Sequence, residues 1–277
     1  MEEKAAGQVV QFEGVTVRFD DEETALDRVS FGVEAGASCI VLGAAGSGKT
    51  VLLKSAVGLL RPDEGRILLF GEDITAMKER ELVELRSRVG ILFQEGGLFD
   101  SLTIEENVSY PLLNQPSIQC PPDRVLPRVE EALRFVELGH TLDKFPSELS
   151  GGMRRRVGIA RANVTEPPLI LYDSPTAGLD PITAHIIMGF IIKERDTKNT
   201  TTMMITHRYQ DGFLLANYRY NRETSQIEPA STNEHAPMLR TKYLVLREGR
   251  LVFEGTPQEI EASTDSYVAK FVKKFEI

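Results

Sequence analysis

The sequence predicts an α/β fold with a mostly parallel core sheet. Short apolar runs alternate with helical patterns along most of the 277 residues, which is typical of parallel strands connected by helices. Two of these runs, residues 89–93 and 169–172, are apolar on both faces, as covered parallel strands are. A glycine-rich turn at residues 43–50 ends one strand pattern and opens a helical pattern. Together these features predict a largely parallel sheet with helices around it.

The predicted strands are spread along the whole chain. Val15, Val17 and Phe19 alternate with polar residues, as in a half-buried strand. The other strand patterns are apolar runs at residues 38–43, 66–70, 89–93, 169–172, 202–205 and 243–246. Helical patterns lie at residues 79–88, 124–138, 151–162 and 181–195, and a further one begins at Lys49.

Two helix starts and two unusual segments complete this outline. Thr103 and Glu106 have the spacing of a capping box, and Asp180 offers an N-cap acceptor before Pro181. Residues 103–146 are mostly helical in pattern, and we expect them to form a lobe beside the sheet. Residues 217–240 are polar and lack a clear period, so we expect an extended loop or lid, either functional or disordered.

Composition limits the classes of function. The net charge of -9 argues against a broad nucleic-acid surface, and we expect no nucleic-acid partner. Cys39 and Cys120 are far apart and do not form a disulfide framework. The longest apolar run, residues 186–192, is much shorter than the roughly 20 residues of a spanning helix. We therefore expect a soluble chain that reaches a membrane only through a partner.

The glycine-rich turn reads GAAGSGKT and fits the phosphate-binding P-loop pattern. Its glycines allow backbone N–H groups to approach phosphate oxygens closely. Lys49 supplies a positive charge for the β- and γ-phosphates, and Thr50 offers a hydroxyl to Mg²⁺. The pattern predicts a site for ATP and Mg²⁺. Its candidate residues are Gly43, Ala44, Ala45, Gly46, Ser47, Gly48, Lys49, Thr50 and Val51.

A second motif lies far along the chain. Leu149 to Met153 read LSGGM and open an arginine-rich helical pattern. A serine hydroxyl and free N–H groups at a helix start form another anion site. Two phosphate sites so distant in sequence suggest that the second serves the nucleotide of a neighbouring molecule.

With these motifs in order, the chain resembles the ATP-binding cassette (ABC) ATPases. The resemblance implies a P-loop NTPase of the ABC type, with an antiparallel β edge and a helical signature subdomain. It also implies one domain over residues 8–277, with that subdomain at about 95–165, the polar insertion at 217–240 and a helical tail at 256–277. By the same resemblance, Phe19 stacks on adenine, Gln94 contacts Mg²⁺ and couples to a membrane partner, and His207 senses the γ-phosphate. The other residues that it assigns are Ser150, Gly151 and Gly152 for the γ-phosphate across a homodimer, Asp173 near Mg²⁺, and residues 177–180 as the D-loop.

One position departs from the family pattern. The family usually has glutamate directly after the aspartate that corresponds to Asp173, whereas this chain has Ser174. A serine hydroxyl cannot act as the general base near neutral pH. His207 or Glu95 would position the attacking water, Ser174 would orient it by hydrogen bonds alone, or the chain is a slow, switch-like ATPase. We expect ATP binding to persist and hydrolysis to be slow but measurable.

Two short sequence segments indicate a particular type of transporter. Residues 91–111, ILFQEGGLFDSLTIEENVSYP, and the tail at residues 266–272 are similar to Mla-type ATPases. That similarity implies a peripheral subunit on the cytoplasmic face of the inner membrane, which moves phospholipid with an MlaE-like permease and an MCE-domain protein. The alternatives are a methionine-type or other small-solute importer, a regulatory subunit with little turnover, and a DNA-repair or translation cassette.

Two features leave open alternatives. Arg154, Arg155 and Arg156 follow the LSGGM motif, and they form either a solvated helix face or a contact near the dimer or permease. The tail is either an ordinary terminal helix or a latch on the partner subunit.

Overall fold

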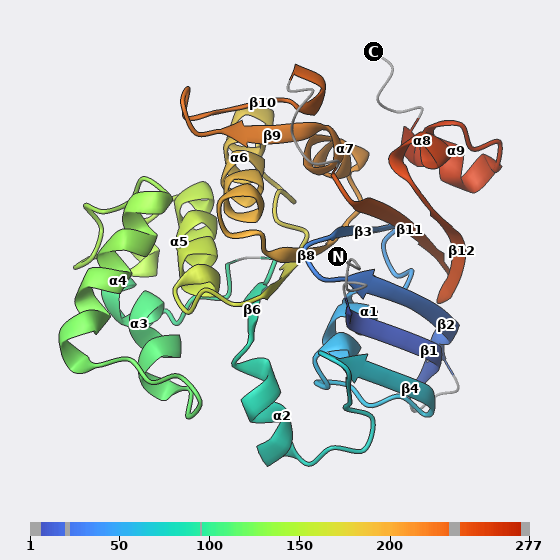
Figure 1. The fold of residues 1–277 in the computed structure, drawn as a ribbon, viewed down its shortest axis with the longest axis horizontal. Helices are drawn as coiled ribbons and strands as arrows, with labels where there is room; N and C mark the ends of the chain where they lie inside the picture. Colours follow the sequence, from blue (N-terminus) through green and yellow to red (C-terminus); the bar gives the residue numbers. More distant parts are fainter. Residues whose placement is uncertain (1–6, 20–22, 95, 233–238, 273–277) are drawn as a thin grey trace, which may run out of the picture. The chain divides into compact units, whose positions relative to one another are not determined.

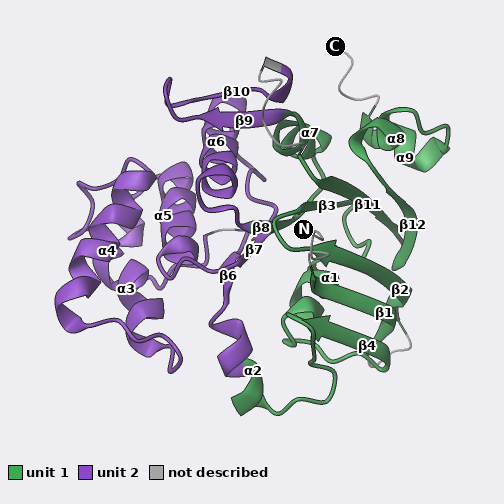
Figure 2. Cartoon of the chain, in the orientation of Figure 1, with its two compact units in different colours: residues 1–82, 201–217, 233–277 green, residues 83–200, 218–232 purple. Residues whose placement is uncertain are grey.

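The computed structural model describes residues 7–19, 23–94, 96–232 and 239–272 (Figure 1). It divides into two compact units, and each is described here by itself (Figure 2). Unit 1 comprises residues 1–82, 201–217 and 233–277, and unit 2 comprises residues 83–200 and 218–232. Helix α2 (Glu79–Arg86) runs through the division.

Unit 1 contains an antiparallel sheet with the strand order β2-β1-β4-β5. Its strands are β1 (Gln8–Arg18), β2 (Thr24–Glu34), β4 (Glu64–Leu69) and β5 (Glu72–Asp73). Side chains alternate between buried and exposed along β2, as expected for a sheet with one covered face. Phe12 and Phe31 stack in the core beneath β1 and β2, with ring centroids 4.7 Å apart. This sheet is the predicted antiparallel edge.

Unit 1 also contains the parallel strands that carry the phosphate turn. Strand β3 (Ser38–Gly43) pairs in parallel with β8 (Thr201–Thr206) and with β11 (Thr241–Arg247), and β12 (Arg250–Gly255) pairs antiparallel with β11. All side chains of β3 and β8 are buried. Helix α1 (Lys49–Ala56) follows β3, α7 (Tyr209–Asn217) follows β8, and the chain ends with α8 (Pro257–Glu261) and α9 (Ser266–Val272).

Unit 2 combines one parallel strand pair with a group of helices. Strands β6 (Val89–Leu92) and β7 (Leu169–Asp173) are parallel. The helices are α3 (Ile104–Asn114), α4 (Pro122–Phe135), α5 (Gly151–Asn163) and α6 (Pro181–Lys198) (Figure 1). The capping box at Thr103 and the N-cap at Asp180 are both formed. The α/β class and the mixed strand directions are therefore as predicted.

The polar insertion differs from the expected loop. Strands β9 (Tyr218–Asn221) and β10 (Gln226–Pro229) form an antiparallel hairpin, followed by a short 3₁₀ turn at Ala230–Thr232. The hairpin lies against α6, where Arg195 donates to the Tyr218 carbonyl at 2.7 Å. Residues 233–238, the rest of that prediction, lie outside the described residues. Within the described parts of the chain, no helix combines the length and apolarity that crossing a membrane requires.

Candidate nucleotide-binding site

The glycines of the P-loop are required by close backbone contacts. A side chain at Gly43 would strike the Ser47 hydroxyl and bring its Cβ to 2.7 Å from the Leu246 carbonyl oxygen. Gly48 has φ of 98°, and a Cβ there would strike the Ala25 carbonyl. Only glycine meets both conditions at low cost. Both glycines therefore fix the path of the turn that leads into α1.

Lys49 lies folded over this turn. Its Nζ donates to the carbonyl oxygens of Gly43 at 2.9 Å and Ala44 at 2.7 Å. Residues 44–46 are exposed, and so is Thr50 in the first turn of α1. An ammonium group, an exposed glycine-rich loop and a helix start are thus gathered in one place, which is the arrangement that binds a polyphosphate.

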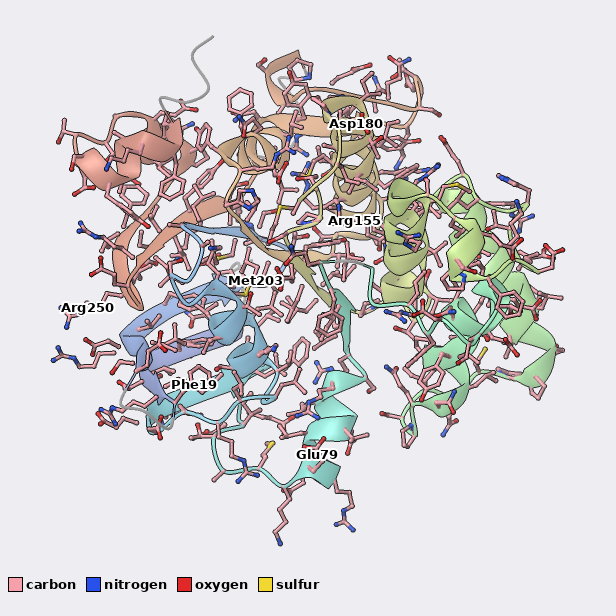
Figure 3. All side chains as sticks on the ribbon, turned by 180° about the vertical axis from the view of Figure 1, so that it is seen from behind. Phe19, Glu79, Arg155, Asp180, Met203 and Arg250 are labelled. Atoms are coloured by element: carbon pink, nitrogen blue, oxygen red, sulfur yellow. The ribbon has the colours of Figure 1, made fainter. Side chains whose placement is uncertain are left out.

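Two further predicted residues belong to unit 1. The register pairs Leu42 with Thr206, the last residue of β8. His207 follows directly and therefore lies at the sheet edge where β3 leads into the P-loop. His207 is exposed. Phe19, labelled in Figure 3, follows β1 and is 46% exposed, so its ring is accessible to a ligand. The sheet therefore brings His207 to the edge that carries the P-loop.

The remaining catalytic candidates belong to unit 2. The register pairs Leu92 with Tyr172, so Gln94 and Asp173 lie at the same edge of the β6–β7 pair. Asp173 is buried, with 7% of its surface exposed. Ser174 has φ of 47°, a left-handed conformation that is uncommon for residues other than glycine. Glu95, the alternative for positioning water, lies outside the described residues.

The LSGGM motif forms the start of helix α5. The Ser150 hydroxyl accepts a hydrogen bond from the Met153 N–H at 3.2 Å, which leaves its own proton free to donate. A Cβ added at Gly151 would meet no atom within 4 Å, whereas one at Gly152 would come within 2.6 Å of Thr183. The helix start at Gly151 is therefore uncovered in this chain, as an anion site must be.

The arginines of α5 do not form a solvated face. Each guanidinium donates to at least one backbone carbonyl, and the carbonyl groups are those of Leu149 for Arg154, Gln94 for Arg155, Val136 for Arg156, and Gly96 and Gly97 for Arg161. Only 7% of the Arg155 surface is exposed. The solvated-face alternative is therefore wrong for Arg155, whereas Arg154 and Arg156 are half-buried. The bond from Arg155 spans 61 residues of sequence, and no local pattern reports such a pairing.

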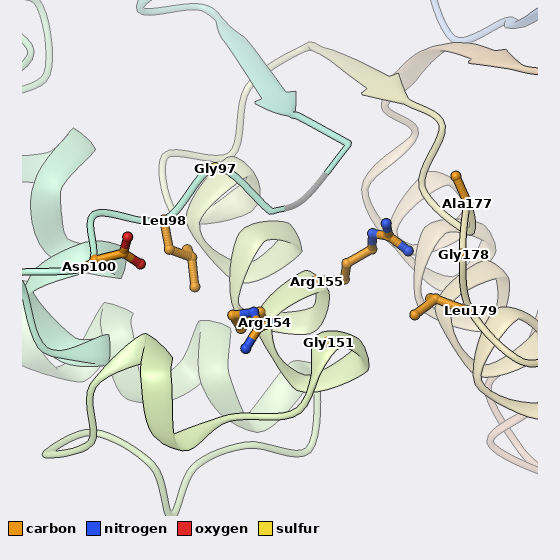
Figure 4. A pocket seen from close by; sticks show the side chains of 9 residues that line it. All are labelled: Gly97, Leu98, Asp100, Gly151, Arg154, Arg155, Ala177, Gly178 and Leu179. Carbon is orange, nitrogen blue, oxygen red and sulfur yellow. The ribbon is translucent and has the colours of Figure 1, made fainter. Parts of the chain in front are cut away.

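A cavity of about 510 Å³ lies within unit 2 beside Arg155 (Figure 4). Three segments line it: residues 97–100, the start of α5 and the D-loop residues Ala177, Gly178 and Leu179. The Arg155 side chain reaches from α5 toward the D-loop (Figure 4). The signature helix and the D-loop thus share one polar cavity.

The C-terminal helix supplies a contact that the sequence did not predict. The Tyr267 hydroxyl accepts from the Ala44 N–H at 3.3 Å and donates to the Leu246 carbonyl at 3.2 Å. The Arg247 guanidinium lies 5.2 Å from the centre of the Tyr267 ring. Helix α9 is therefore attached to the P-loop of its own chain.

Side chains that could bind a metal ion are spread out among the residues that the structure describes. Over the described ranges, no three His, Cys, Asp or Glu side chains are arranged to hold a metal ion. Mg²⁺ usually binds one or two carboxylates together with substrate phosphates. By chemical type, Thr50 of unit 1 and Gln94 and Asp173 of unit 2 suit that requirement, in which the nucleotide would supply the other ligands.

The fold and the phosphate turn define a P-loop protein of the α/β class. The ABC transporter family profile matches residues 26–177, more than half of the chain. The chain belongs to the ABC transporter family, whose ATP-binding domain it carries. An ATP-binding cassette solved as a dimer in a post-hydrolysis state with ADP and Pi is 27% identical, with a TM-score of 0.72 over 89% of this chain and 98% of that one.

The relatives similar to this chain are named for the transport of different substrates. Mkl of Mycobacterium leprae, a probable ribonucleotide transport ATP-binding protein, is 39% identical over 73% of this chain and 57% of its own length. MetN of Corynebacterium diphtheriae, a methionine import ATP-binding protein, is 40% identical over 73% of this chain and 59% of its own length. MlaF of Haemophilus influenzae, an intermembrane phospholipid transport ATP-binding protein, is 32% identical over 89% and 84%. The chain therefore spans less than two thirds of the first two relatives.

Proposed function

We propose that this chain is the ATP-hydrolysing subunit of an ABC transporter. In this proposal two copies pair head to tail around two Mg²⁺-ATP, on the cytoplasmic face of the inner membrane. The P-loop is the observation that carries it, because Lys49 lies over a turn whose shape requires Gly43 and Gly48. The uncovered start of α5 supports the second half of each site.

The residues then divide the work between two copies. Residues 43–51 of one copy hold the phosphates, Phe19 stacks on adenine, and Thr50, Gln94 and Asp173 hold Mg²⁺. Ser150 donates its free hydroxyl proton to the γ-phosphate of the facing copy, together with the N–H groups of Gly151 and Gly152. His207 contacts the γ-phosphate from the sheet edge beside the P-loop. Charge neutralisation and positioning, which dominate phosphoryl transfer, are thus supplied without a residue that replaces the missing glutamate.

The permease would contact unit 2. Exposed aromatic and aliphatic side chains gather after β6 and on α3, where Phe99 is 43% and Leu113 is 63% exposed. The rings of Phe99 and Tyr110 lie 4.8 Å apart. Large exposed apolar groups of this kind mark interaction surfaces. Loss of phosphate would open the dimer and move this surface with its permease.

For the substrate, we propose phospholipid or another lipid, moved with an MlaE-like permease and an MCE protein. The length of the match supports this choice, since MlaF aligns over 247 residues and MetN over 204. The Mla-like wording of residues 91–111 supports it as well. The second candidate is a methionine-type importer, which is favoured by the higher identity to MetN, 40% against 32%.

Purification of the tagged chain from membranes tests the substrate class. We expect an MlaE-like permease and an MCE-domain protein in the complex. A solute-binding protein in their place would favour the importer, and a nucleic acid or ribosome would contradict transport altogether. Single-turnover hydrolysis by the same complex separates a working ATPase from a regulatory subunit, which would bind ATP and release no phosphate.

A further inference from the structure

One face of helix α5 fits the described part of the segment that follows β6, Gln94 and residues 96–99, called here the Q-loop. Arg155, Gly158 and Arg161 are spaced three residues apart, which puts them on neighbouring turns of one helix face. All three meet the Q-loop or the end of β6. Arg155 belongs to the arginine run that follows the LSGGM motif, and the proposed ATPase mechanism gives no role to either arginine of this face.

Arg155 holds the backbone of Gln94 directly. Its Nε donates to the Gln94 carbonyl at 2.8 Å, and the residue is 7% exposed. A buried guanidinium is costly unless its donors are paired, so burial alone does not account for an arginine at this position. What the arginine adds is a charge-assisted hydrogen bond in a fixed direction, which is stronger than a neutral bond.

Arg161 and Gly158 extend the same contact. The Arg161 Nη2 donates to the carbonyls of Gly96 at 3.0 Å and Gly97 at 2.8 Å. Its guanidinium also lies 5.7 Å from the centre of the Phe99 ring, within cation–π range. A Cβ at Gly158 would come within 2.6 Å of Leu92 and 3.0 Å of the Gly96 oxygen. Glycine therefore lets α5 approach the Q-loop closely enough for both arginines to bind it.

We propose that Arg155 is a positioning residue for Gln94. It ties the backbone from which the Mg²⁺-binding amide extends to the helix whose first residues, Ser150 to Gly152, bind the facing γ-phosphate. Mg²⁺ affinity at Gln94 then depends on the position of α5. This inference rests on the proposed function, in which Gln94 contacts Mg²⁺. It goes beyond that function because it gives the buried arginine a part in nucleotide binding without contact to nucleotide.

Mg²⁺ titration of nucleotide binding tests the positioning role. The affinity of the full-length chain for a fluorescent ATP analogue is measured in EDTA and then at rising Mg²⁺ concentrations. The recorded value is the Mg²⁺ concentration that gives half of the maximal increase in affinity. In Arg155→Gln we expect this concentration to rise about tenfold, equivalent to about 1.4 kcal/mol, while affinity in EDTA changes less than about twofold. Arg155→Lys, which keeps one charged donor, should recover part of the effect.

The matched control is Arg156→Gln. Arg156 is the next residue of the same helix and also donates to a carbonyl, that of Val136, outside the Q-loop. We expect wild-type Mg²⁺ dependence from this variant. An equal shift in both variants would mean that the arginines support the helix in general, and would overturn the inference.

A double-mutant cycle shows whether Arg155 acts through Gln94. In a Gln94→Ala background, Arg155→Gln should shift the Mg²⁺ dependence no further, because the amide that it positions is absent. Full additivity of the two substitutions would contradict the proposal.

Hydrogen exchange separates this inference from the proposed function. Without nucleotide, the Q-loop amides should exchange faster in Arg155→Gln than in the wild type, and at the wild-type rate in Arg156→Gln. A wild-type chain that binds no ATP would refute the proposed function, whereas this exchange result would still support the positional claim. Wild-type exchange and wild-type Mg²⁺ dependence in Arg155→Gln, in a chain that binds ATP, would overturn the inference alone.

Discussion

At the residue scale, Ser174 is the position at which we expect nucleotide binding and hydrolysis to be separable. It follows the buried end of β7 in a left-handed conformation with φ of 47°. That conformation costs a residue other than glycine about 1–2 kcal/mol, whichever side chain it carries. A glutamate at this position would therefore bear the same backbone strain as serine, and would add a carboxylate next to Asp173.

The first prediction is that Ser174→Glu speeds hydrolysis. General-base help is typically worth about 10² to 10⁴ in rate, so we expect at least a tenfold rise in single-turnover phosphate release by the purified complex. Ser174→Gln is the control, since it has a similar shape and no basic carboxylate. Release no faster in Ser174→Glu than in the wild type would show that the water is positioned by another group.

The second prediction concerns Lys49. Its Nζ contacts two carbonyls of the P-loop, and on nucleotide binding it would turn to the phosphates. Lys49→Ala should lower ATP affinity at least about tenfold, because a hydrogen bond to a charged group contributes about 1.5–3 kcal/mol. Equilibrium binding of a fluorescent analogue measures this. Lys54→Ala, an exposed lysine on the same helix, should bind as the wild type does, and equal affinities in all three chains would refute the P-loop assignment.

At the element scale, α6 joins the hairpin to the rest of unit 2. Arg195 and Asp196 form an ion pair at 2.7 Å, and both also bind the hairpin, through the Tyr218 carbonyl and the Tyr220 N–H. Polar composition led us to expect a loop in this region. The structure instead has two short polar strands that charged groups of a helix bind, a contact that no local period reports.

A buried carboxylate on α6 gives the third prediction. Glu194 is 1% exposed. Burial raises its pKa to about 7, although the nearby positive charge of Lys198 acts in the opposite direction. The folded state therefore binds the proton more tightly than the unfolded state, and folding loses stability as pH rises from about 4.5 to about 7.

Glu194→Gln removes this loss. At about 1.4 kcal/mol per pKa unit, the variant should be more stable than the wild type at pH 8 by up to about 3 kcal/mol. The difference should shrink toward pH 4.5. Urea unfolding at several pH values measures it, and a difference independent of pH would mean that Glu194 does not titrate near neutrality.

At the scale of the whole molecule, the sequence predicts features that depend on local spacing. Each of three such features spans only a few residues: the P-loop, the signature helix start and the N-cap at Asp180. The parallel pairing of β6 and β7 places Gln94 and Asp173 at the same sheet edge. Strands β2, β5 and β12, helix α7 and the hairpin are not predicted by the sequence patterns. Neither are the bonds of Arg155 and Tyr267, since their partners lie 61 and 223 residues away. Such pairings depend on tertiary packing rather than on local propensity.

The head-to-tail dimer is the central claim, and the structure offers a well-placed variant. Gly151 stands at the uncovered start of α5, where a side chain meets no atom of its own chain within 4 Å. An aspartate there favours the helix start and repels the γ-phosphate of a facing copy. Gly151→Asp should therefore fold and bind ATP as a monomer, but fail to pair. Gly151→Ala is the uncharged control.

Sedimentation velocity with Mg²⁺-ATP is the most direct measurement. With the slow hydrolysis that we propose for Ser174, the wild-type dimer should accumulate, and the sedimenting mass should double with ATP and not with ADP. Gly151→Ala should dimerise in part, and Gly151→Asp should stay monomeric while it still binds ATP. A Gly151→Asp chain that dimerises as the wild type does, or a wild type whose mass does not respond to ATP, would contradict the shared site.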